Sequence, residues 1–142
     1  MAKILSIDFG QKRTGLAISD DLQMIGSPLK TVPTNTIFDE LVKLSSSDNI
    51  MGFVVGMPQD LKGRETDATA KVKIFVKQLK KKFPEMGVWT EDERFTSKMA
   101  LQSMIDGNIS KSRRRDKSVI DNVSAAIILQ SFLDRKAHEN KK

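Results

Sequence analysis

Hydrophobic positions recur with two different spacings along the chain, and each spacing predicts one kind of element. Short apolar runs that end at turn residues are typical of strands, and they cover residues 3–9, 14–19, 26–32, 50–55 and 88–91. Apolar residues three or four positions apart predict helices, which cover residues 37–44, 66–82, 96–105 and 119–135. Thr34 or Asn35 is the expected cap of the first helix. Because strands cluster first and then alternate with helices, we expect an α/β fold with a mixed sheet.

Length and composition fit one globular domain. The chain has 142 residues, of which 39% are hydrophobic and 30% charged, so we expect a single domain over residues 1–136 and a charged C-terminal tail over 137–142. No apolar run is long enough to span a membrane, and the first residues lack the long apolar region of a secretory signal. We therefore expect a cytoplasmic protein with no membrane partner.

The residue types restrict the chemistry. The sequence has no Cys, which excludes disulfides, thiolate zinc sites and thiol nucleophiles. Its single histidine, His138, lies in the charged tail beside Glu139, which argues against a histidine base or metal ligand. Any catalysis must therefore depend on carboxylates, hydroxyls, Lys and Arg.

The charge favours a polyanionic partner. Lys and Arg number 24 against 18 Asp and Glu, a net charge of +6, and phosphate contacts made by such a surplus release counterions. Residues 111–117 hold five basic side chains in seven, which predicts a loop that grips phosphate, although a solvated charge run is the alternative. The lysines between 73 and 82 are interpreted as an ordinary exposed helix face. The small residues before Thr66 predict, weakly, an anion site at a helix N-terminus.

Acidic residues stand at three places where folding alone explains them poorly. Asp8 ends the first strand, residues 91–93 (Glu-Asp-Glu) end the last one, and Asp121 precedes an apolar helix stripe. Open α/β sheets place ligands at the carboxyl ends of their strands. The alternatives are a turn Asp, a capping loop and an Asp favoured by the helix dipole. Three converging carboxylates would suit a hard cation such as Mg²⁺, and which acid of the run contributes remains open.

Four motifs resemble the YqgF, or RuvX-like, nucleases, and together they cover nearly the whole chain. They are Ile7-Asp8-Phe9-Gly10-Gln11-Lys12-Arg13-Thr14-Gly15-Leu16-Ala17, then Val54-Val55-Gly56-Met57-Pro58 with Gly63, then Asp92-Glu93-Arg94-Phe95-Thr96-Ser97, and finally Asp121 followed by Ala125-Ala126 and Ile128-Leu129-Gln130. Phe95, where a Leu is common in the family, and Ser124, where Ala is usual, are mild departures.

The resemblance implies a ribonuclease H-like mixed sheet with helices on both faces. It also implies a catalytic site in which Asp8, Glu93 and Asp121 bind Mg²⁺ or Mn²⁺, with Asp92 as the second choice within the acidic run. Asp8 would bridge the metals, and Glu93 and Asp121 would hold one each. The family is associated with maturing the 5′ end of the 16S ribosomal RNA precursor and is also described as a Holliday junction resolvase.

The combined interpretation is a magnesium-dependent nuclease that acts on precursor ribosomal RNA. The side chains expected to bind nucleic acid are Lys12, Arg13, Arg94, Arg113, Arg114 and Arg115. The alternatives are a resolvase of four-way DNA on the same site and a nucleic-acid binder without catalysis. An actin-like sugar kinase shares the Asp8-Phe9-Gly10 signature but generally needs a second domain. We expect a monomer or a weak homodimer, because no dimer surface can be seen in the sequence.

Overall fold

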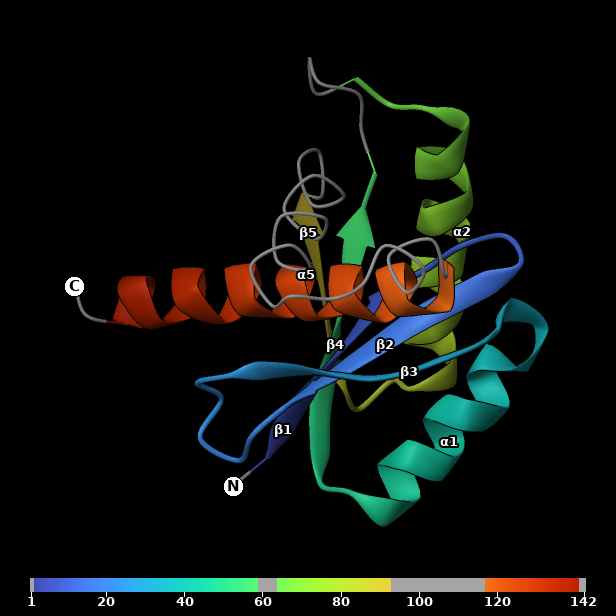
Figure 1. The fold of residues 1–142 in the computed structure, drawn as a ribbon. Coiled ribbons are helices and arrows are strands. Elements are labelled where there is room, and N and C mark those ends of the chain that lie inside the picture. The colour runs from blue at the N-terminus through green and yellow to red at the C-terminus, as the bar shows by residue number, and fades with distance from the viewer. Residues whose placement is uncertain (1, 59–63, 93–116, 141–142) are drawn as a thin grey trace.

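The computed structural model describes residues 2–58, 64–92 and 117–140, and the elements keep the labels of Figure 1. The strands are β1 (Lys3–Asp8), β2 (Arg13–Ser19), β3 (Gly26–Pro33), β4 (Ile50–Met57) and β5 (Gly87–Asp92). The helices are α1 (Ile37–Ser47), α2 (Asp67–Lys82) and α5 (Lys117–Asn140), with a short 3-10 turn, η1 (Thr34–Thr36), before α1. Every predicted strand is confirmed to within two residues at each end. The helix expected over 96–105 lies outside the described residues.

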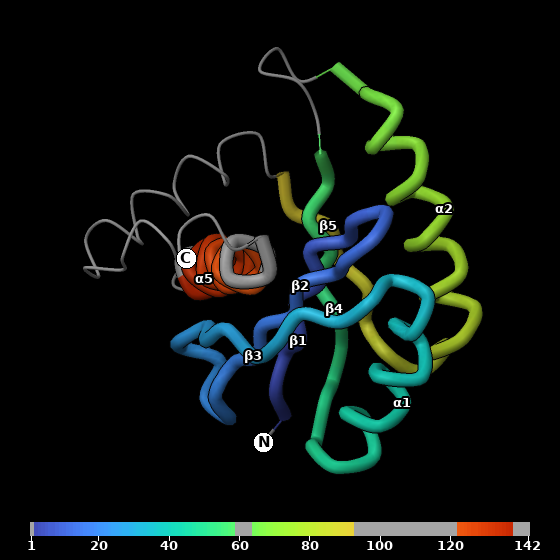
Figure 2. Tube along the Cα trace, turned by 45° about the vertical axis from the view of Figure 1, so that its right-hand side comes forward, coloured from blue at the N-terminus to red at the C-terminus, as the bar shows by residue number. Residues whose placement is uncertain are grey.

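The five strands form one mixed sheet in the order β3-β2-β1-β4-β5. The β1–β2 and β2–β3 pairs are antiparallel, whereas β1–β4 and β4–β5 are parallel. Figures 1 and 2 show α5 lying across one face of the sheet, with α1 and α2 on the other face. The predicted mixed sheet with helices on both faces is therefore confirmed.

Two hydrophobic cores, one on each face, hold these layers together. The core on the α1 and α2 face contains Leu5 and Ile7 of β1, and the core on the α5 face contains Ile4. The alternation follows from the period of two in a strand, which sends successive side chains to opposite faces. The predicted inner stripes of both long helices are buried; they comprise Val72, Phe75, Val76 and Leu79 of α2 and Ala125, Ile128 and Phe132 of α5.

The last helix is longer than expected. α5 continues to Asn140, so most of the segment predicted as a charged tail is helical. None of the helices in the described ranges is long and apolar enough to cross a membrane.

Candidate active site

Asp8 ends the central strand and faces α5. Two residues earlier, the Ser6 hydroxyl donates a hydrogen bond to the carbonyl of Ala125 in α5, with 2.5 Å between the oxygens. Ile4 packs in the α5-side core, whereas Leu5 and Ile7 point to the opposite core. Because side chains two apart in a strand share a face, Asp8 lies on the α5 face, and it is half-buried there.

Glycines flank Asp8 on both neighbouring strands. Asp8 pairs with Gly15 of β2. The parallel register, in which Ile7 pairs with Val55, brings the next residue of β4, Gly56, alongside it. Both glycines are buried, and neither has a side chain to occupy the face that Asp8 shares with them. At the paired positions, neither neighbouring strand therefore places a side chain beside Asp8 on that face.

A tightly held turn follows Asp8. An added Cβ at Gly10 would lie 2.4 Å from the Arg13 carbonyl oxygen, so only glycine fits this close approach. The Thr34 hydroxyl donates to the Gly10 carbonyl at 2.6 Å, and the Thr34 N–H donates to the Lys12 carbonyl at 3.0 Å. The prediction that Thr34 or Asn35 caps α1 was wrong, because α1 begins at Ile37 and Thr36 is its cap residue. Thr34 instead braces the turn beside Asp8, since the sheet brings β3 next to β2.

Two of the predicted nucleic-acid contacts lie on this turn. Lys12 is exposed and Arg13, the first residue of β2, is half-buried. A cleft of about 380 Å³ opens next to them and is lined by Phe9, Gly10, Gln11, Asp67, Ala68, Lys71 and Val72. The cleft therefore joins the turn after Asp8 to the first turns of α2.

The N-terminus of α2 is closed by its own side chains. The Thr66 N–H donates to the Thr69 hydroxyl at 2.8 Å, and the Thr69 N–H donates to the Thr66 hydroxyl at 3.3 Å, a reciprocal capping box. The Thr69 hydroxyl also donates to the carbonyl of Pro58. This capping argues against the backbone anion site predicted before Thr66, because the Thr69 N–H group of the first turn already has a partner.

The acidic run at the end of β5 divides between the two sheet faces. Glu91 is buried and accepts hydrogen bonds from the Ser131 hydroxyl, at 2.7 Å, and from the Arg135 guanidinium of α5. Asp92 is exposed and, by alternation, shares the opposite face with Val88. Glu91 is thus a structural contact between α5 and β5, and Asp92 points away from the face of Asp8. Glu93 lies outside the described residues.

The direction of α5 places its beginning towards Asp8. At the far end of β1, Gly26 in the β2–β3 hairpin donates its N–H to the Gln130 side chain at 2.9 Å, whereas Ala125 is bonded to Ser6. The helix therefore runs from the Asp8 end of β1 towards its start. One turn before Ala125, the backbone of Asp121 lies on the Asp8 side and on the same sheet face.

The remaining predicted site residues fall outside the described part of the chain. They are Arg94, Arg113, Arg114 and Arg115, together with the side chain of Asp121. Among the residues that are described, no three His, Asp or Glu side chains lie together in a way that would hold a metal ion.

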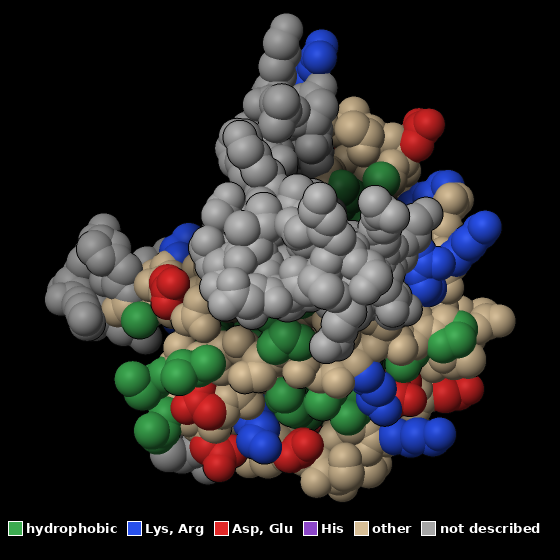
Figure 3. Space-filling view, in the orientation of Figure 1, with side chains coloured by type: hydrophobic (Ala, Val, Ile, Leu, Met, Phe, Trp, Pro, Cys, Tyr) green, Lys and Arg blue, Asp and Glu red, His purple; other side chains and the backbone are tan. Residues whose placement is uncertain are grey.

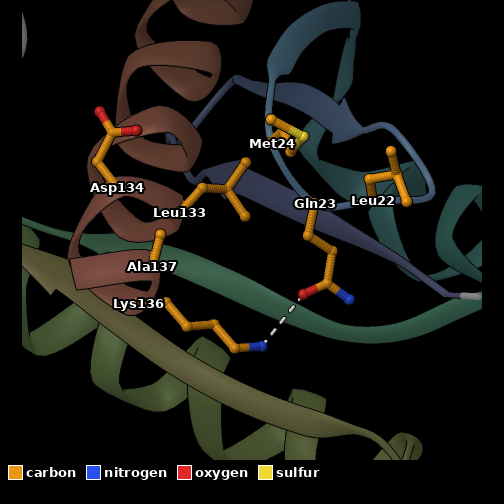
Figure 4. A pocket seen from close by; sticks show the side chains of 7 residues that line it. All are labelled: Leu22, Gln23, Met24, Leu133, Asp134, Lys136 and Ala137. Atoms are coloured by element: carbon orange, nitrogen blue, oxygen red, sulfur yellow. Dashed lines mark hydrogen bonds between the residues drawn. The ribbon is translucent and has the colours of Figure 1, made fainter. Parts of the chain in front are cut away.

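Two further cavities lie away from Asp8. One, of about 300 Å³, lies between the β2–β3 hairpin and the end of α5 (Figure 4), and beside it the Lys136 ammonium donates to the Gln23 side chain at 3.2 Å. It lies at the opposite end of β1 from Asp8, since Leu5 pairs with Ile18 near the hairpin. The other, of about 460 Å³, lies between α1 and α2 and is lined by Phe38, Gln78, Lys81 and Lys82. Neither has paired carboxylates, so the Asp8 end remains the candidate site.

Solved structures share this fold. The fowlpox virus resolvase in complex with Holliday junction DNA superimposes with a TM-score of 0.59 at 12% identity, covering 94% of this chain and 98% of that one. RuvC of T. thermophilus in complex with a Holliday junction substrate gives 0.57 at 17% identity and covers 96% of both chains. The sheet order, the helices on both faces and these similarities define a ribonuclease H-like fold.

Sequence comparison then places the chain within that class. The chain belongs to the RuvX family, because the family model described as "RuvX: Holliday junction resolvase" matches residues 2–135. A Flavobacterium johnsoniae relative named "Putative pre-16S rRNA nuclease" is 43% identical over 136 residues, which cover 96% of this chain and 99% of the relative. A Phocaeicola vulgatus relative with the same name is 42% identical over 138 residues, which cover 97% of this chain and 99% of the relative.

Proposed function

We propose that this RuvX-family chain is a metal-dependent nuclease that hydrolyses phosphodiester bonds in the precursor of 16S ribosomal RNA. The observation that carries the proposal is the placement of Asp8 at the end of the central strand, between two glycines and under the beginning of α5. At the paired positions of the two neighbouring strands, no side chain lies beside this half-buried carboxylate. Such a position favours a role in ligand binding over a role in packing the core. Family membership and the relatives' names support nuclease chemistry.

Asp8, Glu93 and Asp121 are the residues that would hold Mg²⁺ or Mn²⁺. Their donor atoms are carboxylate oxygens, which both ions prefer, and the chain has no Cys to recruit a softer metal. A bound divalent ion would lower the pKa of water and stabilise charge on the phosphate. Glu93 is preferred over its neighbours because Glu91 is bonded to α5 and Asp92 faces away from Asp8.

The basic side chains near Asp8 would bind and orient the phosphate backbone. Lys12 and Arg13 stand on the braced turn directly after the carboxylate, so their backbone is fixed relative to it. Arg94 and the arginines at 113–115 would add contacts from the segments that adjoin Glu93 and Asp121. Phosphate contacts of this kind set position and register on the nucleic acid rather than sequence preference.

A resolvase acting on four-way DNA is the second candidate, favoured by the description of the family. Cutting two strands symmetrically would require a two-fold dimer, whereas a single copy is enough to trim an RNA. The relatives' names favour the RNA substrate, which is made in the cytoplasm, and we place the protein there.

A cleavage assay separates the two candidates. The protein is incubated with precursor ribosomal RNA and, separately, with a four-way DNA junction, each with Mg²⁺ and with EDTA, while its mass in solution is measured. We expect cleavage of the RNA that depends on Mg²⁺, by a protein that is monomeric or only weakly dimeric. Preferential, symmetric cutting of the junction by a dimer would replace the RNA proposal with the resolvase.

A further inference from the structure

Helix α2 carries a run of positive charge that packing does not explain. Every charged residue between Lys71 and Lys82 is a lysine, and all six are exposed; they are Lys71, Lys73, Lys77, Lys80, Lys81 and Lys82. Ordinary solvated helices interleave acidic and basic residues, because like charges four positions apart destabilise a helix. In Figure 3, Lys and Arg side chains gather over α2 at the right of the molecule.

Four of these lysines form one stripe along the helix. Lys73, Lys77, Lys80 and Lys81 follow the spacing i, i+4, i+7 and i+8, beside the buried stripe that begins at Val72. In the described part of the chain Lys73 pairs with Glu65, whereas Lys77, Lys80 and Lys81 have no carboxylate partner. We call these four residues the α2 stripe.

The helix dipole accounts for only part of this charge. Lysines in the last turn, such as Lys80 and Lys81, interact favourably with the negative C-terminal end of the helix. The same dipole gives no stabilisation to Lys73 and Lys77, which lie in earlier turns. Glu65 offsets the charge of Lys73, and the remaining repulsion at Lys77 is relieved when a polyanion lies along the helix.

Helix α2 begins close to the candidate active site. The first turns of α2, with Asp67, Ala68 and Lys71, line the cleft shared with Phe9, Gly10 and Gln11, directly after Asp8. From there the 16 residues of α2 extend for about 24 Å away from that end of the sheet. The stripe lies on the other flank of α2 from Lys71, and α2 packs on the sheet face opposite to Asp8, so a nucleic acid with its cleaved bond at Asp8 reaches the stripe by passing over the carboxyl end of the sheet.

We propose that the α2 stripe binds the backbone of the arm of the nucleic-acid substrate that extends beyond the cleavage site. This inference rests on the proposed function and revises the sequence-based interpretation of these lysines as an ordinary exposed face. The contacts are to phosphates and independent of sequence, because Lys acts as a point charge and the aromatic residue of α2, Phe75, is buried. The arm is RNA if the substrate is precursor ribosomal RNA.

The test compares two variants that lose the same charge. Lys77→Gln/Lys80→Gln removes two lysines from the stripe, and Lys43→Gln/Lys82→Gln removes two exposed lysines from α1 and from the other flank of α2. Binding is measured in EDTA, over a range of salt, to a short RNA that spans only the cleavage site and to a longer RNA with an extended arm. Cleavage of the short RNA is measured with Mg²⁺.

We expect the stripe variant to bind the longer RNA roughly tenfold more weakly at low salt, with the log–log salt slope lowered by roughly 1.4 to 1.8 units for two lost phosphate contacts. Its binding and cleavage of the short RNA should match the parent, and the control variant should keep the parental slope on both RNAs.

Equal slope changes in the two variants, or equal losses on both RNAs, would overturn the proposal. Stripe-dependent binding to phosphatidylglycerol vesicles, with RNA binding unchanged, would also overturn it in favour of a membrane surface. A parent that binds the long RNA through the stripe but cleaves nothing would support the stripe and contradict the nuclease.

Discussion

At the scale of single residues, the β2–β3 hairpin shows how one carboxylate organises a loop. The Asp20 carboxylate accepts hydrogen bonds from the N–H groups of Leu22, at 3.2 Å, and of Met24 and Ile25, both at 2.8 Å. Gln23 adopts a φ of 56°, a left-handed conformation that is uncommon outside glycine, and its side chain donates to the Ala2 carbonyl. Polar groups thus turn inwards and leave the apolar side chains of the loop exposed.

These bonds make the loop sensitive to acid. The backbone N–H of Ile25, followed by that of Met24, stabilises the charged form and lowers the pKa of Asp20 below its usual value. A lowered folded-state pKa means that Asp20 stabilises the protein above its unfolded pKa of about 3.9, and that this contribution is lost as the pH falls through the folded value. We expect Asp20→Ala to destabilise the protein at pH 7 and to lose this effect progressively as the pH falls below about 3.9, measured by urea unfolding.

The exposed neighbour Asp21, replaced by Ala, serves as the control, because no such set of N–H bonds is expected to stabilise its charge. A deficit of Asp20→Ala that stays constant from pH 7 to pH 2 would show that the carboxylate's charge does not organise the loop.

At the scale of elements, alternation within strands explains what the sequence could and could not predict. Asp8 could be proposed as a site residue from the sequence because it ends an apolar run just before the Phe9-Gly10 turn, and the structure confirms that it ends β1. The faces of Glu91 and Asp92 were not predictable, because consecutive acids in a strand point to opposite faces and the residues they meet come from distant elements. Ser131 and Arg135, which bond to Glu91, are 40 and 44 residues away in the chain.

The contact of Glu91 with α5 yields a stability prediction. Arg135→Ala would leave the buried Glu91 carboxylate with Ser131 as its remaining partner among the described residues, whereas Glu91→Gln removes the charge and keeps a hydrogen-bonding group. We expect Arg135→Ala to cost about 2 kcal/mol and Glu91→Gln about 1 kcal/mol, the former discounted because half of the Arg135 side chain is exposed. Urea unfolding measures both.

Asp134→Asn, an exposed change on the same turn of α5 that keeps an oxygen to accept the Gln130 amide, is the matched control and should stay close to the parent. If Glu91→Gln proved as costly as Arg135→Ala, the ion pair with Arg135 would not be the reason that Glu91 is buried.

At the scale of the whole molecule, the sheet order determines where chemistry is possible. The parallel strands β1, β4 and β5 end at the same edge, and α5 crosses one face with its beginning towards that edge. The edge strand β3 carries Pro28, Pro33 and a register shift, features that discourage pairing with another sheet. Sequence pattern predicted the layers, because hydrophobic spacing is local. It left open which face each acid occupies, because that depends on strand register and on contacts between residues more than a hundred positions apart, such as Ser6 and Ala125.

The most direct test of the central claim, that Asp8 belongs to the cleavage site, is the activity of Asp8→Asn. The substitution keeps the size of the side chain and removes its charge, and Asp21→Asn at the other end of the molecule is the control. Cleavage of precursor ribosomal RNA in Mg²⁺ is measured together with thermal melting of the same preparations. We expect Asp8→Asn to fold and to melt cooperatively yet to cleave several orders of magnitude more slowly, while Asp21→Asn cleaves normally. A folded Asp8→Asn that cleaves at close to the parental rate would contradict the claim.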